Sequence, residues 1–283
     1  LFEKVDIIWL LRLIQLDPLF MTFDPKKWNS NGSTSQSLFS DENWILLACE
    51  KESIYRRSSK SFYYVYNLKT KELKSLSDTS LGKQRLAEFS PDNSKIAFVR
   101  NNNLFYVTLS DFDEKPVTKD GKINKIINGA TDWVYEEEFG LVRAFEWSPD
   151  GKHIAYYKFN ETHVKEFSMD IFGGGLYPSQ EVFKYPKAGE ENSIVKVYVY
   201  NIEEDKHQYI YTEKDYEYYP RIKWTNNADL LVLYGMNRHQ NELDFIIANV
   251  AENTNRILFT EKDKYYIDIH DNLTFLPENN FVW

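Results

Sequence analysis

The sequence is poor in the features that mark several common protein classes. Cys49 is its single cysteine, which excludes an internal disulfide and a cysteine-based metal site. Lys and Arg number 34 against 43 Asp and Glu, and the formal net charge of −9 repels nucleic acid phosphates. We therefore expect no nucleic acid partner.

Long hydrophobic runs are also missing. The apolar stretch at residues 7–14 is interrupted by Arg12 and followed by Asp17 and Pro18, well short of the roughly 20 residues that a membrane span needs. A packed terminal segment is the preferred interpretation of residues 1–38, with a signal-peptide remnant as the alternative. Because the chain begins with Leu1, we expect it to start inside a longer gene product.

The motifs of hydrolytic catalysis are absent as well. No Gly-x-Ser-x-Gly nucleophile elbow occurs in the sequence. The five histidines are scattered without the spacing of a metal site or of a catalytic triad. We therefore expect no catalytic residue, no metal and no cofactor in this chain.

Aromatic residues are abundant. They make up 16% of the chain, with 20 Tyr, 19 Phe and 7 Trp, and such rings pack well on the pleated surface of a sheet. The hydrophobic share of 42% is enough for a sizeable core. The composition predicts an all-β protein.

A short sequence motif recurs along the chain. An aromatic residue, a tight turn rich in Ser, Pro, Asp and Asn, and an apolar strand follow one another at roughly 50- to 80-residue intervals. Each copy of the motif predicts a β-hairpin, and a second strand pair follows most copies. The copies begin at Phe39, Phe89, Trp147, Trp224 and Phe275.

Two hairpins per repeat predict four-stranded antiparallel blades, and hence a β-propeller over residues 39–283. The longest interval contains Gly173-Gly174-Gly175, which predicts an extended arm at about residues 168–195. The fifth repeat has only begun at Trp283. We therefore expect an incomplete propeller with about five blades present.

The most unusual stretch is acidic, at residues 131–140. Asp132 suits the N-cap of a short helix, and Gly140 suits the left-handed conformation that ends one. Neighbouring glutamates on a helix lie about 100° apart, so two of them can converge on one cation such as an α-ammonium group. Charge alone leaves open that this acidic turn merely faces water.

The run Asp132-Trp133-Val134-Tyr135-Glu136-Glu137-Glu138 resembles the signature of the dipeptidyl peptidase IV family, which are prolyl oligopeptidase-type serine peptidases. Residues 147–151, 159–162 and 185–189 follow in the order of that family, so the resemblance covers about residues 40–283. It implies an N-terminal propeller of eight blades, paired with an α/β-hydrolase domain that this chain lacks. The chain alone is then expected to be inactive.

The resemblance also implies roles for individual residues. Glu137 and Glu138 would fix the free amino terminus of a peptide, so that the enzyme releases dipeptides ending in proline or alanine. Arg56, in the run Tyr55-Arg56-Arg57-Ser58, would hold a backbone carbonyl of the peptide. Glu136, Asp132 and Tyr135 would support them. Solvated side chains are the competing interpretation of Arg56 and of the glutamates.

Further implications concern partners and setting. The family's arm helps to form homodimers, and its members work in the periplasm, at the cell surface or outside the cell, so we expect the same here. Leu141 and residues 265–268 do not match further propeller contacts of animal members, so subsite preferences do not carry over.

Two other functions compete with this hypothesis. A non-catalytic propeller that serves as a protein-binding platform would carry the same turns but would not need the glutamates. A sugar-active five-bladed propeller would need paired acids on separate blades, and no clear pair is evident.

Overall fold

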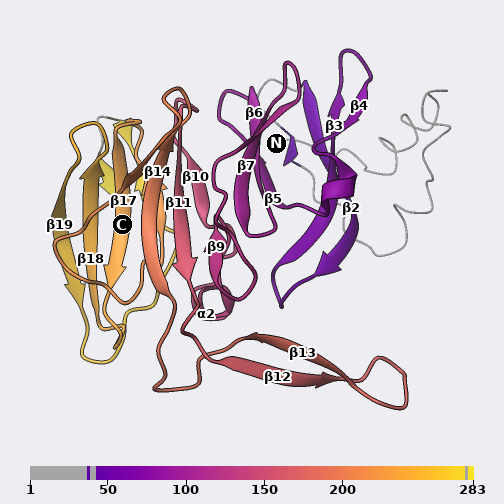
Figure 1. The fold of residues 1–283 in the computed structure, drawn as a ribbon. Helices are drawn as coiled ribbons and strands as arrows, with labels where there is room; N and C mark the ends of the chain where they lie inside the picture. Colours follow the sequence, from indigo (N-terminus) through magenta and orange to yellow (C-terminus); the bar gives the residue numbers. More distant parts are fainter. Residues whose placement is uncertain (1–36, 39–42, 278–279) are drawn as a thin grey trace.

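The computed structural model describes residues 37–38, 43–277 and 280–283, and these form an almost entirely β structure (Figure 1). The expectation for the N-terminal segment falls outside the described residues except for strand β1 (Ser37–Leu38). Within the described part, no helix has the length and apolar character to cross a bilayer.

Four antiparallel sheets of the blade type follow one another along the chain. The first blade contains β1, β2 (Trp44–Ser53), β3 (Ser59–Asn67) and β4 (Leu73–Ser75). The second contains β5 (Arg85–Phe89), β6 (Lys95–Arg100), β7 (Asn103–Thr108) and β8 (Asp113–Pro116). The 3-10 helix η3 (Thr79–Leu81) lies between the two.

The third and fourth blades repeat this order. The third contains β10 (Phe145–Trp147), β11 (His153–Asn160), β14 (Ile194–Asn201) and β15 (Lys206–Tyr209), and β9 (Ile126–Asn128) also pairs with β11. The fourth contains β16 (Ile222–Trp224), β17 (Leu230–Met236), β18 (Glu242–Asn249) and β19 (Thr254–Lys262). A last hairpin pairs β20 (Thr274–Phe275) with β21 (Phe281–Val282). Four blades and the first hairpin of a fifth confirm the predicted propeller.

The recurring turn has a physical cause that two of the blades share. In the second blade Ser90 Oγ donates to Asp92 at 2.6 Å and accepts from Lys95 N at 3.0 Å. In the third blade Ser148 makes the same bonds, to Asp150 and from His153 N. One hydroxyl therefore closes the turn by bonding both the turn and the start of the next strand.

The tryptophans that end strands β10 and β16 join neighbouring blades. Trp147 Nε1 donates to Glu88 O at 3.3 Å, and Trp224 Nε1 donates to Glu146 O at 3.1 Å. Each bond reaches the residue just before the aromatic anchor of the preceding blade. In these two repeats the indole N–H thus joins one blade to the next, whereas a phenylalanine occupies the same position in the other copies.

The segment predicted as an arm contains a separate hairpin between β11 and β14. Strands β12 (Glu166–Ile171) and β13 (Ser179–Lys184) pair only with each other and extend away from the blades (Figure 1). The base of this hairpin lies next to the short helix α2 (Trp133–Glu138), which precedes β10.

Candidate functional site

The predicted short helix is present as α2. The Asp132 carboxylate accepts a hydrogen bond from Tyr135 N at 3.0 Å, as an N-cap does, and Gly140 follows with a φ of 61°. These local signals set both ends of the helix. The three glutamates therefore lie on successive positions of its last turn and point in different directions.

Tyr135 anchors the helix in the core. Its ring lies 4.9 Å from that of Phe159 and 5.2 Å from that of Phe139, both edge-on, and its hydroxyl accepts a hydrogen bond from Tyr219 N at 2.8 Å. Burial raises the pKa of this hydroxyl well above its usual value. The helix is thereby fixed against strands of the third blade and the start of the fourth.

Glu136 connects the helix to the first blade. Its side chain is fully buried, and its Oε1 accepts hydrogen bonds from Arg57 N at 2.6 Å and from Ser58 N at 2.9 Å. Such charge-assisted bonds are stronger than neutral ones. Glu136 therefore holds the turn that carries Arg56 beside the helix.

Glu137 and Arg56 meet at the surface. Arg56 Nη1 lies 3.5 Å from Glu137 Oε2, with side-chain exposures of 74% and 16%. Glu138, the next residue, is exposed. Of the three residues predicted as substrate contacts, the structure thus brings Arg56 and Glu137 together, and Glu138 is their exposed neighbour in the chain. Because the Arg56 side of this ion pair is exposed, the pair contributes about 1 kcal/mol or less, and a ligand can replace Arg56.

Two further acids lie beneath the helix. Asp132 is buried and accepts a hydrogen bond from Ser193 Oγ at 2.6 Å, while burial raises the pKa of its carboxyl. Burial, together with the charge of Asp132, raises the pKa of Glu161 to about 7, against the opposing effect of Lys184. Sequence reasoning noted Glu161 only as part of a matching run.

This Glu161 carboxyl predicts a pH dependence of stability. Its folded-state pKa lies above the ordinary value of 4.5, so its ionisation disfavours folding, and the free energy of unfolding falls as pH rises from 4.5 to about 7. Glu161→Gln should remove that fall and add about 1–3 kcal/mol at pH values above 7. Thermal denaturation at about pH 5 and about pH 8 measures it. An unchanged pH dependence in the variant would contradict this account.

Aromatic rings join the base of the arm to the same site. The ring of Trp133 lies 4.3 Å from that of Tyr185, and the ring of Tyr55 lies 5.9 Å from that of Phe183. The arm therefore packs against both the helix and the turn that carries Arg56. No local sequence signal links these four residues.

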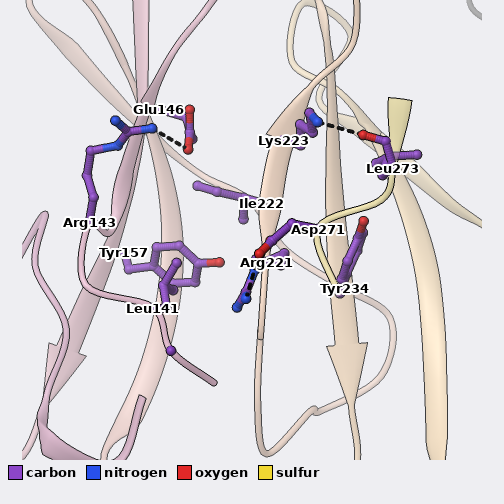
Figure 2. A pocket seen from close by; sticks show the side chains of 11 residues that line it. Leu141, Arg143, Glu146, Tyr157, Arg221, Ile222, Lys223, Tyr234, Asp271 and Leu273 are labelled. Atoms are coloured by element: carbon purple, nitrogen blue, oxygen red, sulfur yellow. Dashed lines mark hydrogen bonds and ion pairs between the residues drawn. The ribbon is translucent and has the colours of Figure 1, made fainter. Parts of the chain in front are cut away.

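A polar cavity of about 400 Å³ lies beyond the end of the helix, between β10 and β16 (Figure 2). Arg143 pairs with Glu146 at 3.0 Å, Arg221 pairs with Asp271 at 2.6 Å, and Lys223 Nζ donates to Leu273 O at 2.6 Å. The buried Tyr157 hydroxyl points toward Arg221 and has no hydrogen-bond partner among the described residues. Sequence reasoning missed this cavity because its walls come from distant segments.

The described part of the chain holds no group of three or more His, Cys, Asp or Glu side chains arranged to bind a metal ion. The groups that Arg56, Glu137 and Glu138 present are one guanidinium and two carboxylates. Such a set suits a ligand with an ammonium group next to a hydrogen-bond acceptor.

Comparison with known proteins identifies the family. The model of the dipeptidyl peptidase IV N-terminal region matches residues 40–283. A probable dipeptidyl-aminopeptidase B of Uncinocarpus reesii is 30% identical over 257 residues, which are 84% of this chain and 28% of that protein. The inactive dipeptidyl peptidase 10 of Rattus norvegicus is 31% identical over 231 residues, which are 78% of this chain and 28% of that protein.

A solved structure is similar over most of the chain. The crystal structure of Porphyromonas gingivalis dipeptidyl peptidase 4 matches with a TM-score of 0.83 and 35% identity, covering 92% of this chain and 38% of that one. The fold is that of a propeller domain, and the chain belongs to the dipeptidyl peptidase IV family as its N-terminal region. It spans 28% of the length of the curated relatives described here.

Proposed function

We propose that this chain is the substrate-anchoring and gating propeller domain of a serine-type dipeptidyl peptidase, which releases dipeptides ending in proline or alanine from peptides with a free amino terminus. Glu137 and Glu138 bind the α-ammonium group, and Arg56 binds a backbone carbonyl. An α/β-hydrolase domain of the same polypeptide performs the hydrolysis.

The observation that carries this proposal is the meeting of Arg56 with Glu137, beside Glu138, across two different blades. An ammonium group that binds both carboxylates releases Arg56 from its ion pair, and the freed guanidinium can then donate to the peptide carbonyl. A fixed amino terminus determines which peptide bond reaches the catalytic domain. The anchoring energy is thus converted into orientation of the reacting bond.

The test compares two substrates of the full-length protein. A chromogenic Gly-Pro substrate with a free amino terminus should be cleaved, while its N-acetyl form, which has no ammonium group, should be cleaved at least about 100-fold less efficiently. Equal cleavage of the two would contradict the amino-terminal anchor. One family relative is named as inactive, so absence of cleavage from both is a real outcome, and it would reject the peptidase.

A protein-binding platform without catalysis remains the second candidate. If the full-length protein cleaved neither substrate but bound a folded protein stably, this second function would be favoured. Under that function the Glu137 and Arg56 pair would be a surface feature without a peptide ligand.

We also propose that the arm mediates homodimers. Its tip exposes apolar side chains, with Leu176 at 96% and Tyr177 at 87% exposure, which favours burial against a partner. Replacing both with Asp should convert a dimer of the full-length protein into a monomer in analytical ultracentrifugation. An unchanged dimer, or a wild-type monomer, would reject this proposal.

The cellular setting is inferred from the resemblance to the dipeptidyl peptidase IV family. We propose that the full-length protein acts in the periplasm, at the cell surface or outside the cell, where peptides with free amino termini are processed. Subcellular fractionation tests this, and a purely cytoplasmic protein would contradict it.

A further inference from the structure

Three aromatic residues form a cluster at the base of the arm. Phe167 and Phe183 lie opposite each other in the pairing of β12 with β13, and their ring centroids are 6.3 Å apart. The ring of Tyr185 lies 5.5 Å from that of Phe167 and 6.1 Å from that of Phe183. Tyr185 N also donates to Lys165 O at 3.0 Å, which continues the pairing past the end of β13. Rings at these separations pack on one another, so the base of the arm is a defined unit.

This arm-base cluster contacts two elements that are distant from it in the sequence. The ring of Tyr185 lies 4.3 Å from that of Trp133, the first residue of α2. The ring of Phe183 lies 5.9 Å from that of Tyr55, the residue before Arg56. Within the described part of the chain, β12 and β13 pair only with each other. Ring packing, and not backbone pairing, therefore connects the arm to the helix and to the turn.

The contacted residues are close neighbours of the candidate substrate contacts. Trp133 is four positions before Glu137, so the two side chains share a face of the helix. Arg56 lies between Tyr55, on which the arm packs, and the next two residues, whose backbone N–H groups are bound by Glu136. The turn is thus held on both sides of Arg56, once by the arm and once by the helix.

We propose that Phe183 and Tyr185 are positioning residues of the amino-terminal clamp, which consists of Arg56, Glu137 and Glu138. The two rings hold the turn and the helix at a fixed separation, so that a peptide meets a clamp that is already ordered. They act through the residues on which they pack and do not bind the peptide. This inference rests on the proposed function and deepens it.

The experiment measures steady-state kinetics of the full-length protein with the free-amino Gly-Pro substrate and its N-acetyl form. Tyr185→Ala and Phe183→Ala should each raise KM for the free-amino substrate about tenfold while kcat changes less than about threefold, because binding must then also order the clamp. Cleavage of the N-acetyl form, which does not use the clamp, should change less than about twofold. Tyr185→Phe keeps the ring and should retain the KM of the wild type.

A double-mutant cycle tests the contact between the arm and the helix directly. Trp133→Ala removes the ring on which Tyr185 packs and should raise KM about tenfold as well. The double variant Trp133→Ala/Tyr185→Ala should also stay at about tenfold, since the second substitution removes a contact that is already lost. An increase of about 100-fold, the product of the two single effects, would mean that the rings act independently and would contradict the inference.

Phe259→Ala is the matched control. Phe259 is a half-buried aromatic residue of β19, and its ring packs 6.3 Å from that of Phe281 in the last hairpin. Its replacement should lower the melting temperature and leave KM unchanged. The thermal denaturation of every variant is followed alongside, so that loss of folding is separated from loss of affinity.

The outcomes separate this inference from the proposed function. If the wild type prefers the free-amino substrate, the positioning role alone is overturned by alanine variants with an unchanged KM, by loss of folding in both of them, or by a KM increase that Phe259→Ala shares. A wild type that cleaves neither substrate, or both equally, overturns the proposed function and this inference with it. A KM increase that is confined to the free-amino substrate and absent from Tyr185→Phe supports it.

Discussion

Glu138→Gln in the full-length protein is expected to lower kcat/KM for dipeptide release by roughly two orders of magnitude, and Glu137→Gln by a similar factor. Each substitution keeps the shape of the side chain but removes one charge from the pair that binds the ammonium group. Glu138 is exposed, and Glu137 forms an ion pair with the mostly exposed Arg56, so the fold should be little affected. Steady-state kinetics with the free-amino substrate give the measurement.

The control for these variants is Glu203→Gln. Glu203 is an exposed acid of the third blade that pairs with Lys152 at 3.2 Å, far along the chain from the helix. Its loss changes the net charge by the same amount and should leave kcat/KM within about twofold of wild type. If Glu137→Gln or Glu138→Gln behaved like this control, the replaced carboxylate would be a solvated side chain that does not bind the substrate.

The second large effect concerns stability. Tyr135→Ala should destabilise the propeller by about 3–5 kcal/mol, because it removes a fully buried ring that packs on Phe139 and Phe159. Tyr135→Phe keeps the ring and removes only the partner of Tyr219 N, for which we expect about 1–3 kcal/mol. Thermal and urea denaturation of the full-length protein measure both.

The two Tyr135 variants separate the contribution of ring packing from that of the hydrogen bond to Tyr219 N. If Tyr135→Phe were as damaging as Tyr135→Ala, the hydrogen bond to the fourth blade would dominate over ring packing. If neither variant lowered stability, the helix would not be anchored by this side chain. The account predicts the larger loss for Ala and a measurable, smaller loss for Phe.

Features with local causes could be predicted from the sequence. The Ser-Pro-Asp turns reveal the blades because Ser90 and Ser148 close them with bonds to residues only a few positions away. The helix follows from Asp132 and Gly140 at its two ends. Such short-range signals can be recognised in a single sequence because each depends on neighbouring residues alone.

The long-range parts of the site could not be predicted in the same way. The sequence predicts Glu136 only as a supporting residue, because its buried bonds to the backbone of the Arg56 turn depend on how the first blade meets the helix. The contact of Trp133 with Tyr185 likewise depends on the path of the arm. Tertiary packing determines both.

The central claim is that Glu137 and Glu138 bind the substrate's α-ammonium group. The most direct test is the ratio of kcat/KM for the free-amino substrate to that for its N-acetyl form, measured for the full-length wild type and for the double variant Glu137→Gln/Glu138→Gln. The account predicts a ratio of at least about 100 for the wild type that collapses toward one in the double variant, through loss of activity on the free substrate alone. A ratio that the double substitution leaves unchanged would contradict it.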